Sequence, residues 1–424
     1  MAVFLYNIFL FLFKAGTHIA SLFNTKAKKW VQGRKNVFAS LEKTIPKNDK
    51  IIWIHCASLG EFEQGRPIME RLKAQESRYR ILLTFFSPSG YEVKKDYAGA
   101  DWVFYLPMDG RRNAKRFIEL VNPSLVIFVK YEFWYYYLKK IKYRKIPLLL
   151  VSALFRKDMT FFKWYGSLQR KMLSRFDHLF VQNAASKKLV DDLGLGNICS
   201  ISGDTRFDRV LEIAKKSEPV LLVEQFIGNN KVIIAGSTWK EDEEALQKAF
   251  SAINNSSLKL IIAPHEVTES HLKEMTKLFP PAILFSELKT INQQPATSNI
   301  LIIDNIGMLA RLYKYAYLTY VGGGLRSMGV HNVIEAAVYN KIVLIGHHYH
   351  KYIEAVGLVM SGGAIPFNNE KKDGMMLKEL IEALLTDVAE YNYRSKAAGD
   401  FVRSNSGATG RIISYIQEKR LLTN

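Results

Sequence analysis

Cysteine is scarce in this sequence, with only Cys56 and Cys199 among 424 residues. Two cysteines cannot build a disulfide framework, and neither stands at metal-ligand spacing, so they favour a reducing compartment. The sequence also lacks a helix-turn-helix signal, an aromatic RNA-binding motif and zinc-finger spacing, which disfavours nucleic acid as a partner. Because it has no G-x-x-x-x-G-K-[ST] motif, it does not fit a Walker-type ATPase.

The composition predicts a globular protein with an anionic partner. With 48% hydrophobic and 12% aromatic residues, the chain is too apolar for disorder and too long for one typical core, so we expect two domains. Lys and Arg number 59 against 40 Asp and Glu, which gives a formal net charge of +19. Such a surplus fits nucleic acid, anionic lipid or a phosphorylated substrate.

The N-terminus predicts an attachment to a membrane. Residues 2–13 are apolar except for Asn7, and a second apolar patch follows Lys14 and runs through Phe23. The uninterrupted run is shorter than the ~20 residues that cross hydrocarbon, so we expect residues 1–24 to form a tilted or interfacial anchor. No signal-peptide cleavage site follows. The basic residues from Lys26 to Lys35 favour a cytoplasmic position beside anionic headgroups, and a buried first helix is the alternative.

Hydrophobic runs predict an α/β protein with two doubly wound domains. Buried parallel strands are expected at residues 51–55, 80–85, 124–129 and 147–152, and again at 231–235, 258–263, 300–303, 317–321 and 341–345. The segment 215–230 breaks this rhythm and is the expected linker. We therefore expect domains at 35–214 and 231–395, with residues 396–424 forming a final helix that packs back on the first domain.

Two predicted strands of the first domain end in segments that carry a carboxylate. Open α/β sheets bind ligands outside the carboxyl ends of their strands. Residues 57–65 follow the first strand and place Glu61 at a helix start, where the helix dipole keeps it ionised and able to accept a proton. A helix-capping glutamate is the alternative. Residues 130–134 place Glu132 among aromatic residues, either to orient a sugar hydroxyl or to pair with a Lys or Arg.

The second domain contains a glycine-rich loop at residues 322–335, between a predicted strand and a predicted helix. Glycines let backbone amides approach an anion, and a helix start favours negative charge, so a phosphate fits there. Glu335 is suited to ribose hydroxyls. Further loops follow neighbouring strands at 236–239, 263–266 and 346–351. Their histidines at 347, 348 and 350 do not have the geometry of a metal site, so we expect neither a metal nor another cofactor.

The order of these motifs resembles the Kdo transferase family of lipopolysaccharide assembly, from the anchor to about residue 360. The family's W-I-H-x-x-S-x-G-E is found at 53–61, and its E-x-E-[LF]-W at 130–134 with Lys130 replacing the first acid. Its G-x-x-[KR]-[FY]-D is found at 203–208 and its A-x-S-[TW] at 235–238. The family's nucleotide loop is found at 322–335, where one of its glycines and its proline are absent. The family's P-R-H-P-E-R loop is reduced to residues 264–266.

The resemblance implies a GT-B fold, in which two Rossmann-like domains flank a cleft, and an inverting transfer of Kdo. CMP-Kdo would be the donor and a lipid A precursor the acceptor, at the cytoplasmic face of the inner membrane among anionic lipids. Glu61 would be the general base and Glu132 the second essential carboxylate. Substrate-binding roles would fall to Ser58, Gly60, Arg206, Ser237, Thr238, His265, Gly323, Gly324, Arg326, His331, Asn332 and Glu335. The alternatives are a GT-B enzyme that uses a UDP-sugar and a non-catalytic membrane-bound nucleotide or nucleic-acid binder.

Overall fold

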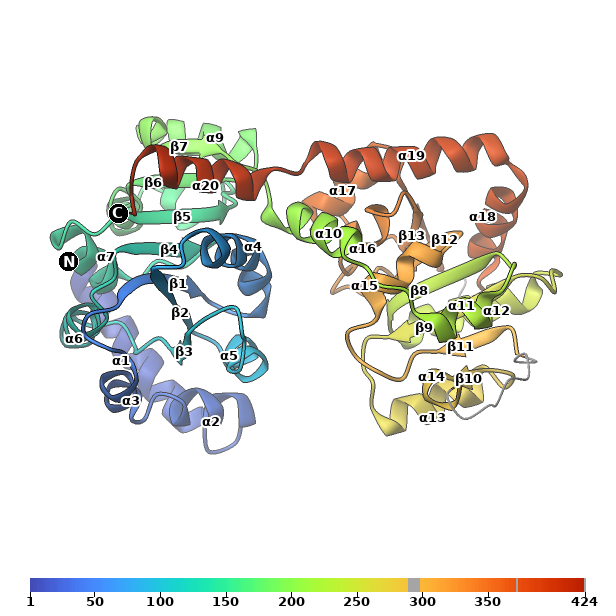
Figure 1. The fold of residues 1–424 in the computed structure, drawn as a ribbon, viewed down its shortest axis with the longest axis horizontal. Coiled ribbons are helices and arrows are strands. Elements are labelled where there is room, and N and C mark those ends of the chain that lie inside the picture. The colour runs from blue at the N-terminus through green and yellow to red at the C-terminus, as the bar shows by residue number, and fades with distance from the viewer. Residues whose placement is uncertain (289–297, 371–372, 423–424) are drawn as a thin grey trace. The chain divides into compact units, whose positions relative to one another are not determined.

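The computed structural model of the chain describes residues 1–288, 298–370 and 373–422. It divides into two compact units, residues 1–208 with 406–424 and residues 209–405 (Figure 1). The chain thus leaves the first unit at Asp208, earlier than the expected linker, and returns to it at Ser406. The segment expected as a linker contains a helix, Leu221–Ile227, whose Val223, Phe226 and Ile227 are buried.

The first unit is built on a parallel sheet of seven strands in the order β3-β2-β1-β4-β5-β6-β7. Its strands are β1 (Lys50–Cys56), β2 (Tyr79–Phe85), β3 (Trp102–Tyr105), β4 (Leu125–Val129), β5 (Leu148–Ala153), β6 (His178–Val181) and β7 (Cys199–Ile201). Its helices are α1 (Ala2–Ala20), α2 (Thr25–Gln32), α3 (Val37–Thr44), α4 (Leu59–Gln75), α5 (Pro88–Lys94), α6 (Arg111–Val121), α7 (Tyr135–Tyr143), α8 (Ser167–Leu173), α9 (Ala184–Asp191) and α20 (Ala408–Glu418), with 3₁₀ turns at Thr160–Phe162 and Gly196–Ile198. Helix α10 (Thr205–Lys215) carries the chain onward.

The second unit repeats this plan with a parallel sheet in the order β10-β11-β9-β8-β12-β13-β14. Its strands are β8 (Val232–Thr238), β9 (Lys259–Pro264), β10 (Ile283–Leu284), β11 (Ile300–Ile302), β12 (Leu318–Val321), β13 (Ile342–Gly346) and β14 (Ala364–Phe367). Its helices are α11 (Leu221–Ile227), α12 (Lys240–Ala252), α13 (Glu269–Leu278), α14 (Phe285–Leu288), α15 (Leu309–Leu312), α16 (Ile334–Ala337), α17 (Ile353–Met360), α18 (Met375–Thr386) and α19 (Val388–Ser404), with a 3₁₀ turn at Tyr313–Tyr315. The predicted α/β class with two doubly wound sheets is confirmed.

Each sheet is buried on both faces because helices cover both sides of its parallel strands (Figure 1). Along β1 the side chains alternate between two cores, with Ile51 and Trp53 in one and Ile52 and Ile54 in the other. Ile412, Ile413 and Ile416 of α20 complete the second of these cores. The last helix of the chain therefore belongs to the first unit, whereas α19 before it lies in the second.

Helix α1 is 19 residues long, and its length and composition would allow it to cross a membrane. Of its residues only Leu10 is buried, so it is not the buried first helix considered as an alternative. One flank is fixed to the first unit, because the Tyr6 hydroxyl donates to Asp109 Oδ2 at 2.8 Å. The rest of the helix exposes large apolar side chains, namely Phe4, Leu5, Ile8, Phe9, Phe11, Leu12 and Ile19.

Candidate active site

Glu61 lies where α4 begins, directly after β1. Ser58 is the N-cap residue, and Glu61 lies in the first turn. Helix α4 can lie this close to the sheet because of Gly65, where a Cβ atom would come within 3.0 Å of Val129 Cγ2 and 3.3 Å of Cys56 Sγ. Glycine at this one position therefore holds the start of α4 against the ends of β1 and β4.

The hydrogen bonds of Glu61 distinguish between its two expected roles, a proton acceptor and a helix cap. The Ser58 hydroxyl donates to Glu61 Oε2, and within the described part of the chain this is the hydrogen bond that Glu61 makes. Among the described residues, the Ser58 side chain makes no cap bond, and Glu61 accepts no backbone N–H. Glu61 is thus not a helix cap by contact, and its Oε1 remains available to accept a proton from a bound molecule.

Glu132 is held by a different set of partners. His55 Nε2 lies 2.8 Å from Glu132 Oε2, and the Trp134 indole N–H donates to the same oxygen. His55 is fully buried and its Nδ1 lies 2.8 Å from Thr84 Oγ1, which fixes the ring. The expected alternative was a Lys or Arg partner, and the structure shows a histidine and an indole instead. Glu132 Oε1 has no partner among the described residues, so it can accept a hydroxyl.

The two carboxylates share one edge of the sheet. They follow β1 and β4, which are adjacent and parallel. Burial raises the pKa of the Cys56 thiol well above its usual range, and the charges of Glu61 and Glu132 raise it further. Cys56 is therefore a protonated core residue beside both carboxylates. The sequence analysis assigned no role to His55, Thr84 or Trp134, although His55 stands inside the W-I-H motif.

Two other expected binding residues of the first unit differ in their surroundings. A Cβ atom on Gly60 would meet only Ser58 Oγ, at 3.8 Å, so the fold itself does not require glycine there. Arg206 pairs with the neighbouring Asp204 at 2.7 Å. In the same segment, Asp208 accepts the backbone N–H groups of Gly407 and Thr409. The 203–208 motif therefore joins α10 to α20, and the guanidinium of Arg206 is not held for a ligand alone.

In the second unit, the glycine-rich loop connects β12 to α16. A Cβ atom on Gly324 would lie 2.7 Å from the backbone nitrogen of Gly346. Glycine at this position therefore allows the loop after β12 to contact the end of β13. Gly323 has a φ of +88° and donates its N–H to Asp242 Oδ2 at 2.8 Å. The predicted helix after the loop, α16, has only four residues, so its dipole contributes little to anion binding.

Beside this loop, three rings form a stack. The ring centroids of Trp239 and His265 are 4.6 Å apart and those of His265 and His331 are 4.4 Å apart. The guanidinium of Arg326 lies 4.2 Å from the Trp239 ring. The Trp239 indole donates to His331 Nε2 at 2.9 Å. Burial lowers the pKa of His331 to about 4, with a smaller effect from His265, so His331 is neutral and its Nε2 is an acceptor.

Two buried acids, which the sequence analysis did not identify, organise the loops. Asp242 accepts from the Tyr320 hydroxyl at 2.6 Å and from the backbone N–H of Trp239 at 3.0 Å, in addition to the backbone N–H of Gly323. Glu243 accepts from the Thr238 hydroxyl at 3.0 Å and lies 3.1 Å from His271 Nε2. Burial raises the pKa of both carboxyl groups. The Thr238 hydroxyl is thus engaged inside the protein.

The remaining expected residues of the second unit lie on the same loops. Ser237 has a φ of +53°, a left-handed conformation that is uncommon for a residue with a Cβ atom. The Asn332 side-chain N–H donates to Glu335 Oε1 at 2.8 Å, while Asn332 Oδ1 is buried without a partner among the described residues. Within the described chain, no group of three or more His, Cys, Asp or Glu residues is placed to hold a metal ion.

Comparison with known proteins identifies the family. Residues 32–209 match the family model of 3-deoxy-D-manno-octulosonic-acid transferase (kdotransferase). The chain is 30% identical over 356 residues to the 3-deoxy-D-manno-octulosonic acid transferase of Aquifex aeolicus, which covers 81% of this chain and 91% of that protein. The chain belongs to the Kdo transferase family. The Haemophilus influenzae transferase is 24% identical over 376 residues, covering 86% of each chain.

Solved structures agree on the fold. The UDP-GlcNAc 2-epimerase of Neisseria meningitidis superposes with a TM-score of 0.61 at 15% identity, covering 87% of this chain and 100% of that one. A putative UDP-N-acetylglucosamine 2-epimerase from Listeria monocytogenes gives a TM-score of 0.61 at 14% identity, covering 88% and 97%. The two parallel sheets thus have the GT-B type of fold, and this Kdo transferase is a glycosyltransferase that transfers Kdo.

Proposed function

We propose that this Kdo transferase takes Kdo from CMP-Kdo and transfers it, with inversion, to the primary hydroxyl of a lipid A precursor (lipid IVA). The observation that carries the proposal is the state of Glu61, a carboxylate at the start of α4 with one oxygen bound by Ser58 and the other open. Such a group is suited to take a proton from a sugar hydroxyl. Gly60 beside it supports this role, because its open Cβ position leaves room for a substrate.

In the proposed reaction, Glu61 removes the proton of the acceptor hydroxyl while the new bond forms between that oxygen and the anomeric carbon of Kdo. The bond from the anomeric carbon to the phosphate oxygen breaks, and CMP leaves with the electron pair. Glu132 orients the acceptor through Oε1, because both of its protein partners contact Oε2. His55 acts as a positioning residue for Glu132.

The second unit would bind CMP-Kdo. Arg326 supplies a positive charge next to the Trp239 ring, which suits a phosphate or carboxylate near a planar base. Asn332 and Glu335 are suited to ribose hydroxyls, and the buried Asn332 Oδ1 is an acceptor to which no described residue donates. Both proposed substrates are anionic, which accounts for the net charge of +19.

We place the enzyme at the cytoplasmic face of the inner membrane, attached through residues 1–24. The apolar side chains exposed on α1 support attachment to lipid, and the bond from Tyr6 to Asp109 supports a helix that stays against the first unit. Deleting residues 1–24 should leave the donor site intact and weaken binding to anionic vesicles. Unchanged partitioning of the truncated protein would contradict this placement.

The decisive experiment incubates the purified full-length protein with CMP-Kdo and lipid IVA and weighs the product. A mass increase of one or more Kdo units, with release of CMP, is the expected result. Competition by CMP but not by UDP would separate this donor from a UDP-sugar. A chain that binds CMP-Kdo without steady turnover would instead be a nucleotide binder, and the proposal would be wrong.

A further inference from the structure

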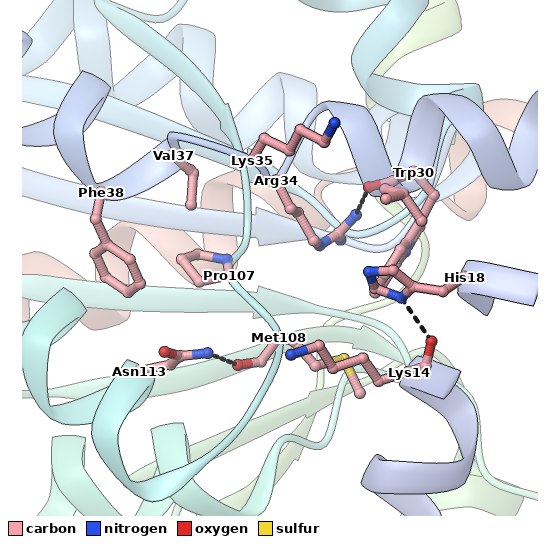
Figure 2. A pocket seen from close by; sticks show the side chains of 11 residues that line it. Lys14, His18, Trp30, Arg34, Lys35, Val37, Phe38, Pro107, Met108 and Asn113 are labelled. Carbon is pink, nitrogen blue, oxygen red and sulfur yellow. Dashed lines mark hydrogen bonds between the residues drawn. The ribbon is translucent and has the colours of Figure 1, made fainter. Parts of the chain in front are cut away.

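A cavity of about 500 Å³ opens beside α1, in the first unit. Figure 2 shows Lys14 of α1 beside Met108 on one side, Arg34 and Lys35 from the turn before α3 on the other, and Phe38 at one end. Trp30 of α2 forms part of its wall. Its volume is within the ~300–1,000 Å³ range of small-ligand pockets. Neither the donor nor the acceptor chemistry described above uses these residues.

The cavity is cationic. None of the residues that line it is Asp or Glu, whereas Lys14, Arg34 and Lys35 are basic. Lys14 and Lys35 are exposed, and the structure gives neither an ion-pair partner among the described residues. An anion in this cavity would therefore meet positive charge on two sides without competition from a protein carboxylate.

Arg34 is the fixed part of this charge. It donates to the backbone carbonyl oxygens of Leu106, Trp30 and Phe86 at 2.9, 3.1 and 2.7 Å. A guanidinium has five N–H donors, so two remain for a ligand. The Trp30 ring lies 3.9 Å from the guanidinium carbon. Burial lowers the pKa of Arg34 to about 9, which leaves it charged at neutral pH, and no carboxylate within the described chain pairs with it.

The surroundings of the cavity are those of a lipid surface. Lys14 belongs to the same helix that exposes Phe11, Leu12 and Ile19 to solvent. A bilayer that covers these apolar side chains brings its phosphates to the level of Lys14 and Lys35. Two aromatic side chains lie between Arg34 and the catalytic edge, because Arg34 packs on Phe86, Phe86 packs on Trp134 at 4.6 Å, and Trp134 contacts Glu132.

We propose that this cavity binds the phosphate headgroup of an anionic glycerophospholipid of the surrounding leaflet. The inference rests on the proposed membrane attachment and adds to it a specific lipid site, distinct from the sites for CMP-Kdo and for the acceptor. Arg34 and the two lysines bind the phosphate, while Phe38 and Met108 contact the glycerol and the first part of the acyl chains.

The test measures partitioning of the full-length protein onto vesicles of phosphatidylcholine alone and of phosphatidylcholine mixed with phosphatidylglycerol. The Lys14→Gln/Lys35→Gln double variant should bind the mixed vesicles about tenfold to thirtyfold less tightly than wild type, because each basic residue near an anionic surface contributes about 1 kcal/mol. Binding to pure phosphatidylcholine should change little. The double variant leaves the half-buried Arg34 and its hydrogen bonds in place, so its folding should be normal.

Two further variants test whether a cavity or only a charged surface is involved. Lys188→Gln removes the same charge from an exposed lysine on α9 and should leave binding unchanged. Met108→Trp fills the cavity without changing its charge and should weaken binding to the mixed vesicles several-fold. If the Met108→Trp protein does not melt at the wild-type temperature, Phe38→Trp is used as the filling variant instead. An equal loss for Lys188→Gln, or no loss for the filling variant, would overturn the proposal in favour of diffuse attraction.

The acceptor provides the last comparison. In detergent without phospholipid, the double variant should keep the wild-type KM for lipid IVA. A raised KM together with unchanged vesicle binding would assign the cavity to the acceptor and overturn the proposal. If the wild type bound neither kind of vesicle, the membrane attachment itself would fail, whereas equal binding to both kinds would refute only the lipid site.

Discussion

The two units share a fold but use their acidic side chains in opposite ways. In the first unit, Glu61 and Glu132 follow strand ends, and each has one oxygen that contacts no partner in the part of the chain that the structure describes. In the second unit, Asp242 and Glu243 are buried and accept hydrogen bonds from the loops around them. The first unit therefore offers carboxylates to a ligand, and the second uses them to fix its own backbone.

This difference matches the chemistry expected of each unit. A proton acceptor needs an open oxygen, whereas a site for an anionic nucleotide sugar must keep negative charge away from the phosphate and carboxylate of the ligand. In the second unit the loop itself carries Arg326 and a neutral His331 beside Trp239, and the carboxylate of Asp242 is occupied by hydrogen bonds from the protein. The same parallel sheet thus supports two kinds of site, and the residues after the strands decide which one forms.

The largest expected effect comes from Glu61→Gln, which removes the open carboxylate of the first unit. Turnover should fall about 10²–10⁴-fold, because glutamine keeps the shape but cannot take a proton. Melting temperature and CMP-Kdo binding should stay close to wild type. Glu63→Gln, two residues along the same helix and 4.0 Å from Arg66, is the matched control and should keep its activity. A Glu61→Gln enzyme with more than roughly a tenth of wild-type turnover would leave Glu132 as the next candidate base.

In the second unit, Glu335→Ala should affect donor binding more than the chemical step. We expect the KM for CMP-Kdo to rise about tenfold with a smaller change in kcat, because ribose contacts act equally in the ground and transition states. Steady-state kinetics with varied CMP-Kdo measures this. If only the KM for the lipid acceptor changed, the assignment of residues 322–335 to the donor would be wrong.

Asp242→Asn tests whether the buried acid of the second unit is structural. An amide cannot accept from Gly323, Tyr320 and Trp239 as the carboxylate does, and lost buried hydrogen bonds cost about 1–3 kcal/mol. We expect a lower melting temperature and a KM for CMP-Kdo raised several-fold. Glu244→Gln, on the same helix, serves as the control. A stable variant with normal KM would show that the loop does not depend on Asp242.

The smallest effect concerns pH. The pKa of His331 falls from about 6.5 in the unfolded chain to about 4 in the folded protein. Between these values the unfolded state binds the proton and the folded state does not, so stability is lost as pH falls from 6.5 towards 4. His331→Asn should reduce the fall in melting temperature over this window. His178 of the first unit has its pKa lowered to about 4 as well, so part of the fall should persist in the variant. An unchanged pH profile would contradict the contribution of His331.

The sequence by itself determined the sheets and the place of the carboxylates. All nine predicted strands are present, because long β-branched runs have few alternatives to burial in a parallel sheet. Glu61 and Glu132 were found because such sheets bind ligands at their carboxyl edges. The strands that were not predicted, β3, β6, β7, β10 and β14, have only two to four residues, and β14 contains Pro366. Runs that short carry little periodicity, so such strands are predicted only in part: β11 and β12, with three and four residues, were predicted, and these five were not.

Only the tertiary structure decided which partners the candidate site residues contact. His55 and Glu132 are 77 residues apart in sequence, and their contact depends on the adjacency of β1 and β4. Arg206 stays a candidate ligand-binding residue, and the structure adds that its guanidinium pairs with Asp204. The glycine loop was predicted from its fit to phosphate, yet Gly324 is also required by the nearby backbone of Gly346. Hydrophobic periodicity is a local property that fixes the elements, whereas hydrogen bonds and ion pairs join residues that only folding brings together.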